Sequence, residues 1–230
     1  MLKHVFIAAL FVGILWVSSA AVDLTSRLTL NAGFSLPTGD FSAAGDNPSS
    51  GFAKFGFGAG AEYDLKIGES GFMWSSSFHY IANDYQSETF IRWPELSLQE
   101  AGTYSNYALL TGIKYQYSLG ESISLFAVGQ IGMNMSTGPF ISGIIGDDSN
   151  QALVEMETEG STTQGYAVGF GLITNATTTL TVRYLSLGSS SINGSVDYKL
   201  GDDRFSKTIE WIQPTSMFLV TVGYAIEFSD

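Results

Sequence analysis

The chain has 230 residues, of which 45% are hydrophobic and only 14% are charged, and its formal net charge is −12. An acidic chain of this kind is a poor nucleic-acid binder, because neutralising phosphates requires Lys and Arg. The absence of cysteine excludes disulfides, thiolate zinc sites and cysteine nucleophiles. The hydrophobicity does not come from a membrane-spanning helix, because the longest apolar run, 5–17, is shorter than the about 20 residues that such a helix needs.

The N-terminal segment is typical of an export signal rather than of the folded protein. A weakly basic start precedes the apolar run, and small residues end it at Ala20, in the positions that a signal peptidase reads. We therefore expect residues 1–20 to be a signal peptide, with Ala21 as the second choice for the cleavage site. A short N-terminal anchor is the alternative, which the length of the run disfavours. The remainder, 21–230, is expected to form one exported domain.

Eight segments of this domain alternate between apolar residues and small or polar ones, with the period of a β-strand. They are rich in aromatic and β-branched residues, and helical patterns are nearly absent. The connections after the first, third, fifth and seventh segments are long and polar, whereas the others are tight turns. The segments are 27–36, 55–65, 72–80, 107–117, 125–133, 165–172, 179–184 and 218–228.

The distribution of charge between the two faces of these segments favours a membrane barrel over a soluble fold. No charged residue falls on an apolar face, and the opposite face carries mainly Gly, Ser and Ala with a few charges. A lipid-facing surface must be uncharged, and a narrow lumen suits small residues. The sequence therefore predicts an eight-stranded antiparallel up-and-down transmembrane β-barrel, with aromatic girdles at both edges of the membrane and both termini in the periplasm. A soluble lipocalin-like barrel is the alternative fold.

Two of the long connections contain strand patterns of their own. Residues 152–159 alternate, and 195–200 and 205–211 flank a turn-like Gly-Asp-Asp-Arg sequence. We expect both connections, 140–163 and 190–213, to continue above the membrane as hairpins. Irregular coil throughout these ranges would contradict that expectation.

The C-terminal segment resembles the assembly signal of outer-membrane barrels. Its run Thr221-Val222-Gly223-Tyr224-Ala225-Ile226-Glu227-Phe228 has the polar residue, the glycine two positions on, and the later hydrophobic residues of that pattern. The stretch 33–41 is similar to the first-strand region of many small bacterial barrels. The chain is thus identified as resembling the OmpA/OmpX-like eight-stranded barrel superfamily. This resemblance implies an outer-membrane location, with outer-membrane lipid and the barrel assembly machinery as partners. A monomer is expected, because the sequence offers no evidence for an oligomer. The residues that it assigns to the assembly signal are Thr221, Gly223, Ile226 and Phe228.

Four charged residues are predicted to face the lumen, and they form the leading candidate site. Charges in a narrow lumen need partners. We therefore expect a buried ion-pair cluster in which Arg183 bridges Glu62 or Glu227; a gate for a narrow ion pathway is the functional alternative. The cluster comprises Glu62, Lys114, Arg183 and Glu227.

The other motifs indicate no catalytic, cofactor or metal site. Gly56, Gly58 and Gly60 lie within a strand and on one face, so they are interpreted as thinning a crowded lumen and not as a nucleotide loop. Outer-membrane lipid A deacylases carry a His-x-Ser motif, but no Ser stands two positions after His79. This histidine also has no recognisable catalytic partner in the sequence. The acidic loop 138–163 is interpreted as a solvated surface, with divalent-cation binding as the alternative.

The sequence therefore predicts a non-enzymatic, structural or surface-recognition scaffold with long acidic extracellular loops. A narrow channel or transporter for small solutes or hydrophobic molecules is the second hypothesis, and a barrel enzyme that acts on lipid is the third. The sequence identifies no extracellular ligand.

Overall fold

The computed structural model describes residues 25–44, 50–86, 96–145, 152–200 and 203–228. The predicted signal peptide, 1–20, lies outside these ranges. Within the described part of the chain, no helix is both long and apolar enough to cross a membrane.

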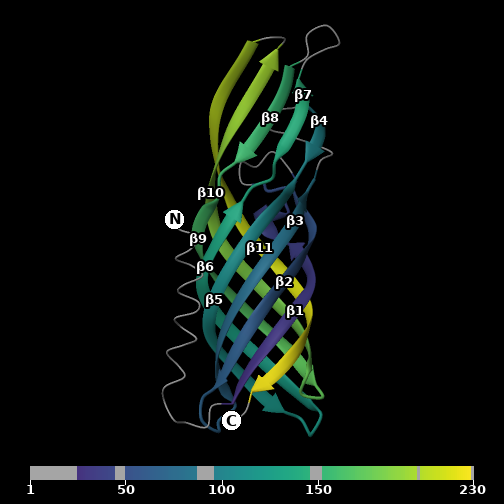
Figure 1. Ribbon diagram of the computed structural model, residues 1–230, viewed down its shortest axis with the longest axis vertical. Coiled ribbons are helices and arrows are strands. Elements are labelled where there is room, and N and C mark those ends of the chain that lie inside the picture. Colours follow the sequence, from purple (N-terminus) through teal and green to yellow (C-terminus); the bar gives the residue numbers. More distant parts are fainter. Residues whose placement is uncertain (1–24, 45–49, 87–95, 146–151, 201–202, 229–230) are drawn as a thin grey trace.

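Eight antiparallel strands close into a barrel (Figure 1). The ring closes where β1 pairs with β11, from Ser26 opposite Phe228 to Pro37 opposite Met217. Closure satisfies the backbone hydrogen bonds of every wall strand, as lipid surroundings require. Each of the eight alternating segments falls within one of these strands, so the predicted barrel is confirmed. The wall strands, in ring order, are β1 (Ser26–Pro37), β2 (Ala53–Lys66), β3 (Phe72–Tyr85), β5 (Thr103–Ser118), β6 (Ile123–Thr137), β9 (Ser161–Thr174), β10 (Thr178–Leu200) and β11 (Asp203–Phe228).

The two faces of the wall are those that the alternation predicts. Large apolar side chains point outward and are exposed, such as Phe57 at 64%, Ile131 at 70% and Phe170 at 66%. Outward aromatic rings also contact one another across neighbouring strands: Tyr184 and Phe218 lie 5.4 Å apart between ring centroids. An apolar belt bearing aromatic pairs is what a barrel in lipid presents, and the fold is of this transmembrane class.

The connections differ in length at the two ends of the barrel, as predicted. Three tight turns, 67–71, 119–122 and 175–177, lie at the end where β1 begins and β11 ends. The long connections lie at the opposite end, where Figure 1 shows a sheet rising above the barrel. On β11, Ile226 and Phe228 of the predicted assembly signal point outward, while Thr221 and Gly223 point inward.

The sheet above the barrel, which we term the extension, continues the wall strands β10 and β11. These strands have 23 and 26 residues, whereas crossing a membrane takes about 9–11. Their pairing shifts register between Ser186 and Ser189, where Gly188 adopts φ +80°. The expected hairpins are present in both connections, because β7 (Ile141–Ile145) pairs with β8 (Ala152–Thr158) and β10 pairs with β11 as far as Leu200. The first hairpin does not simply prolong β6 and β9, since β8 pairs with β10 as well. The added strands are β4 (Leu96–Ala101), β7 (Ile141–Ile145) and β8 (Ala152–Thr158).

A buried apolar cluster fills the upper barrel and continues into the extension. Leu185, Met217 and Leu219 belong to the wall, whereas Ile192 and Val196 belong to the extension, and all five are at most 1% exposed. The short helix η2 (Gly39–Phe41) adds the Phe41 ring from the first long connection. The extension is therefore packed onto the barrel through one continuous core.

Candidate functional site

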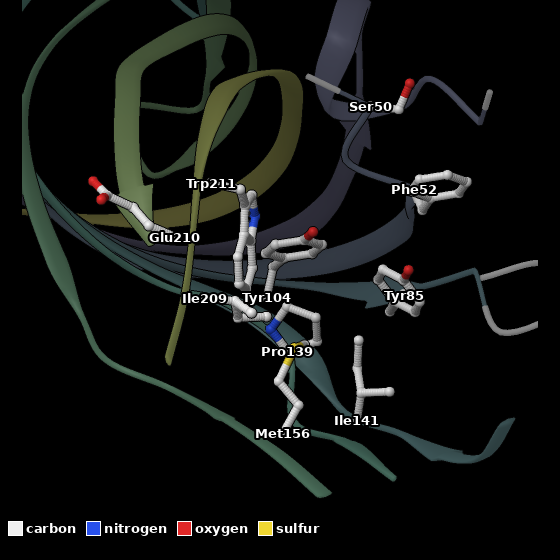
Figure 2. A pocket seen from close by; sticks show the side chains of 10 residues that line it. All are labelled: Ser50, Phe52, Tyr85, Tyr104, Pro139, Ile141, Met156, Ile209, Glu210 and Trp211. Carbon is white, nitrogen blue, oxygen red and sulfur yellow. The ribbon is translucent and has the colours of Figure 1, made fainter. Parts of the chain in front are cut away.

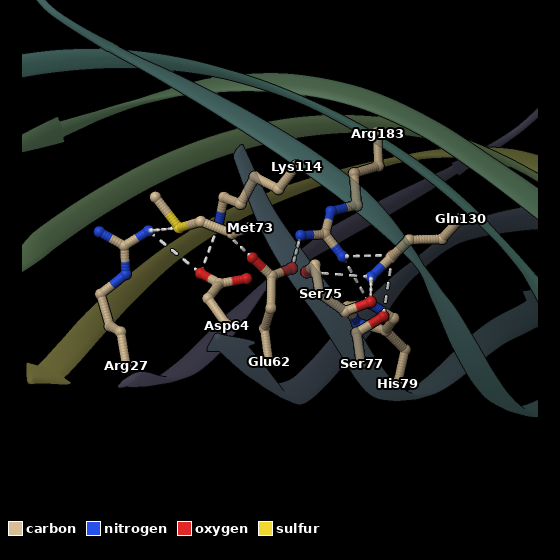
Figure 3. A network of polar contacts seen from close by, with 10 residues as sticks. All are labelled: Arg27, Glu62, Asp64, Met73, Ser75, Ser77, His79, Lys114, Gln130 and Arg183. Carbon is tan, nitrogen blue, oxygen red and sulfur yellow. Dashed lines mark hydrogen bonds and ion pairs between the residues drawn. The ribbon is translucent and has the colours of Figure 1, made fainter. Parts of the chain in front are cut away.

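A network of ion pairs occupies the lumen on the side of the tight turns (Figure 3). Its centre is two buried carboxylates on β2, Glu62 and Asp64, which the strand period places on the same face. Asp64 accepts from Arg27 at 3.0 Å and from Lys114 at 2.8 Å. Glu62 pairs with both Lys114 and Arg183. Three cations thus surround two carboxylates, with every group at most 6% exposed.

Hydrogen bonds extend this network from Arg183 to neutral side chains on β3 and β6. The Arg183 guanidinium donates to His79 Nε2 at 2.9 Å and to Gln130 Oε1 at 3.4 Å. Gln130 also accepts from Ser77 Oγ at 3.0 Å and donates to Ser75 Oγ at 3.2 Å. We term the whole set the lumen network; its members are Arg27, Glu62, Asp64, Ser75, Ser77, His79, Lys114, Gln130 and Arg183.

The bond between Arg183 and His79 spans the full width of the barrel. Arg183 lies on β10 and His79 on β3, and three wall strands separate these two in either direction around the ring. Glu62 on β2 and Arg183 are likewise non-adjacent. A contact between opposite walls must pass through the centre of the lumen, so side chains occupy the barrel axis at this level. This matches the rule that the interior of an eight-stranded barrel is filled by side chains.

Glycines on facing strands make room for the network. A Cβ at Gly169 would lie 2.6 Å from Arg183 Cγ, and one at Gly60 would lie 2.6 Å from His79 Nδ1. Both positions therefore need a residue without a side chain. The interpretation of the 56–60 glycines as thinning a crowded lumen agrees with this geometry, since Gly58 similarly abuts Leu219.

The structure brings together three of the four predicted lumen charges and corrects the fourth. Glu62, Lys114 and Arg183 are connected as expected, with Arg183 on Glu62. Glu227 is exposed near the end of β11 and takes no part in the ion pairs that join the described lumen charges. The prediction was wrong for Glu227: its side chain is exposed, and its register partner Arg27 pairs instead with Asp64 on the other neighbouring strand.

Two further charged members, Arg27 and Asp64, were not among the predicted cluster. Both fall on the inward face that the alternation assigns, so the signal was present in the sequence. They are register partners across β1 and β2, and this adjacency makes their pair. The lumen also holds Lys114 Nζ 4.2 Å from the centroid of the Phe126 ring, a cation–π contact.

The contacts of the lumen network are those of a structural cross-link between the barrel walls. His79 Nε2 accepts from a guanidinium, so the lone pair that a general base would use is engaged. A catalytic triad instead pairs the histidine with a nucleophile and an orienting carboxylate. Among the described residues, no group of three or more His, Cys, Asp or Glu side chains could hold a metal ion. Of the acidic loop, Glu155 and Glu157 are exposed on β8, and Asp147 and Asp148 lie outside the described residues.

A second candidate site is a pocket of about 170 Å³ where the barrel mouth meets the extension (Figure 2). Its residues come from separate parts of the chain: the first long connection, the upper ends of β3 and β5, the start of β7, β8 and the upper half of β11. The aromatic members are Phe52, Tyr85, Tyr104 and Trp211. Pro139, Ile141, Met156, Ile209, Ser50 and Glu210 complete the lining.

Comparison with known proteins finds similar folds but no sequence relatives. No family model and no curated protein matches the chain. Among solved structures, Neisserial surface protein A is similar at 11% identity and TM-score 0.46, covering 88% of this chain and 97% of that one. Ail, the attachment invasion locus protein of Yersinia pestis, is similar at 14% identity and TM-score 0.46, covering 89% of this chain and 100% of that one. The outer membrane protein OprG from Pseudomonas aeruginosa is similar at 11% identity and TM-score 0.46, covering 87% of this chain and 96% of that one. This likeness concerns the strand arrangement and extends to no residue's role.

Proposed function

We propose that this protein is an outer-membrane barrel with a closed lumen, which acts without enzymatic activity as a scaffold that presents its extension to the outside. The observation that carries the proposal is the Arg183–His79 bond across the full width of the barrel. A wall braced from side to side suits a structural support. The extension adds surface that crossing a membrane does not need.

The surroundings of the barrel support an outer membrane. The exposed apolar belt needs lipid, and closure leaves no wall strand with unpaired backbone in it. In the proposed orientation, the tight turns and both termini of the chain face the periplasm. The extension and its acidic β8 then face outward. Assembly by the barrel machinery through 221–228, and a monomeric state, belong to the same proposal.

Single cysteines test this orientation directly, because the natural chain has none. Thr208→Cys places a thiol on the exposed part of β11 in the extension, and Glu121→Cys places one in an exposed tight turn. A membrane-impermeant maleimide added to intact cells is expected to label the first variant and not the second. Labelling of Glu121→Cys alone would show that the orientation is reversed. If the protein is found in the membrane fraction but neither variant is labelled, the extension is not exposed at the cell surface.

The channel hypothesis is tested by conductance. In planar bilayers at high salt, we expect the purified barrel to show no steady open-channel current, because lumen side chains meet across the axis. A reproducible current from the wild-type protein would contradict the closed lumen and establish the narrow channel instead. Lipid A mass analysis of expressing cells tests the barrel-enzyme hypothesis, and an unchanged acylation pattern is expected.

A further inference from the structure

We propose that the pocket between the barrel mouth and the extension binds a small neutral molecule with one apolar ring. This inference deepens the proposed function by naming a ligand class for the outward end. Four aromatic side chains and four aliphatic or thioether ones line the pocket. Such a lining, with few polar groups, is the usual composition of a small-molecule site.

The size of the pocket limits the ligand to a single ring. Its volume is about 170 Å³, while drug-sized ligands occupy roughly 300–1,000 Å³. An apolar protein cavity of about 150 Å³ stays dry and takes up benzene. A one-ring molecule therefore fits, whereas two fused rings exceed the space.

The charge around the pocket favours a neutral ligand. Among the described lining residues the charged one is Glu210, which is exposed and turns away from the aromatic side chains in Figure 2. Its Oε1 accepts from Ser191 Oγ at 2.6 Å on the opposite face of the extension. No described lining residue offers a cation to an anionic ligand, and the chain carries a net charge of −12. An anion is therefore disfavoured, and a cation finds no carboxylate turned inward.

The walls of the pocket are held in place by specific contacts. The Phe52 backbone lies in the left-handed region at φ 54°, which is rare for a bulky residue. Two backbone hydrogen bonds hold it there, from its N–H to Ala43 O at 3.0 Å and from the N–H of Gln86 to its carbonyl at 2.7 Å. Backbone strain of this kind gathers at ligand sites. In this backbone conformation, the centroid of the Phe52 ring lies 6.0 Å from that of the Tyr85 ring.

The neighbouring tyrosine wall is also fixed. The Tyr104 hydroxyl donates a hydrogen bond to Gly51 O at 2.8 Å. The centroid of its ring lies 6.1 Å from that of the Tyr85 ring and 5.1 Å from that of the Phe41 ring. These rings belong to the buried cluster that fills the upper barrel. The pocket therefore ends on packed side chains, and its ligand is retained at the outer end rather than passed through the barrel.

The experiment measures binding of para-fluorophenol to the full-length barrel in lipid nanodiscs by fluorine NMR, with empty nanodiscs as the reference for partitioning. We expect saturable binding by the wild-type protein. Ile209→Trp places a large side chain in the half-buried lining and is expected to weaken binding at least about tenfold. Ile212→Trp is the matched control on the same strand, because Ile212 is 60% exposed and outside the lining, and its binding should equal that of the wild type.

Several results would overturn the proposal. These are binding no greater than to empty nanodiscs, or equal binding by both tryptophan variants. Tighter binding of a fluorinated trimethylanilinium would overturn the neutral class, and equal binding of a fluoronaphthol would overturn the one-ring limit. Heat-modifiable gel mobility identifies a misfolded variant. In that event Trp211→Leu, which removes an aromatic wall, replaces Ile209→Trp with the same expected loss. Planar-bilayer conductance is measured separately, so an open channel and an empty pocket are distinguishable outcomes.

Discussion

The interior of this barrel is filled by two different chemistries along its length. Toward the tight turns, the lumen network joins charged and polar side chains through directed contacts, such as Lys114 between Glu62 and Asp64. Toward the mouth, residues such as Leu185 and Met217 pack in an apolar cluster that extends above the wall. The first region depends on each partner being present, because a buried charge without its partner is costly. The second depends on volume, and its cost follows the space left empty.

The largest expected effect is in the lumen network. Glu62→Gln keeps the shape of the side chain but leaves Lys114 and Arg183 without their shared carboxylate. Breaking a buried ion pair by removing one partner costs about 3–5 kcal/mol. We expect the free energy of unfolding to fall by that amount, measured by urea titration of the barrel folded in lipid vesicles.

Glu227→Gln is the matched control for this change. Glu227 is exposed at the rim, so its substitution should alter stability by about 0.5 kcal/mol or less. Equal losses for the two variants would mean that the lumen network does not brace the barrel.

The apolar cluster gives the next effect. Leu185 is fully buried on the inward face of β10, and Leu185→Ala leaves a cavity costing about 2–5 kcal/mol. Leu180→Ala changes the outward face of the same strand, where the side chain is 41% exposed, and should cost less. The same urea titration compares them. A larger loss for Leu180→Ala would place the stabilising contacts in the lipid-facing belt instead of in the cluster.

The sequence predicted the lumen network better than the upper cluster, for a physical reason. The strand period assigns each residue to one face, and the few inward charges must find partners, so Glu62, Lys114 and Arg183 follow from the pattern. The pairing of Arg27 with Asp64 depends on strand register. Strand β4 lies in a segment without a strong alternation, and Phe52 reaches the pocket through a loop conformation. Neither the β4 strand nor the Phe52 loop conformation follows from the alternation of residues along the sequence.

Crowding around the lumen network gives a smaller effect. Gly169→Ala adds a Cβ 2.6 Å from Arg183 Cγ and 2.9 Å from Val182 O, and overpacking of this kind costs about 1–3 kcal/mol. Gly129→Ala on the neighbouring strand is the control, because a Cβ there meets nothing within 4 Å. Urea titration should separate the two variants. Equal stability would mean that the guanidinium stem moves aside without cost.

The smallest effect is expected in the extension, where like charges face each other on its exposed surface. Glu155 on β8 lies directly opposite Asp197 on β10, and opposing like charges in a sheet destabilise it by roughly 0.2–1 kcal/mol. Glu155→Lys replaces repulsion by attraction, so cleavage of the extension by a protease added to intact vesicles should slow. Asp197→Lys should slow it similarly, and the double variant, which restores like charges, should not. Equal cleavage of all four proteins would show that the extension opens elsewhere, at a step to which this pair contributes nothing.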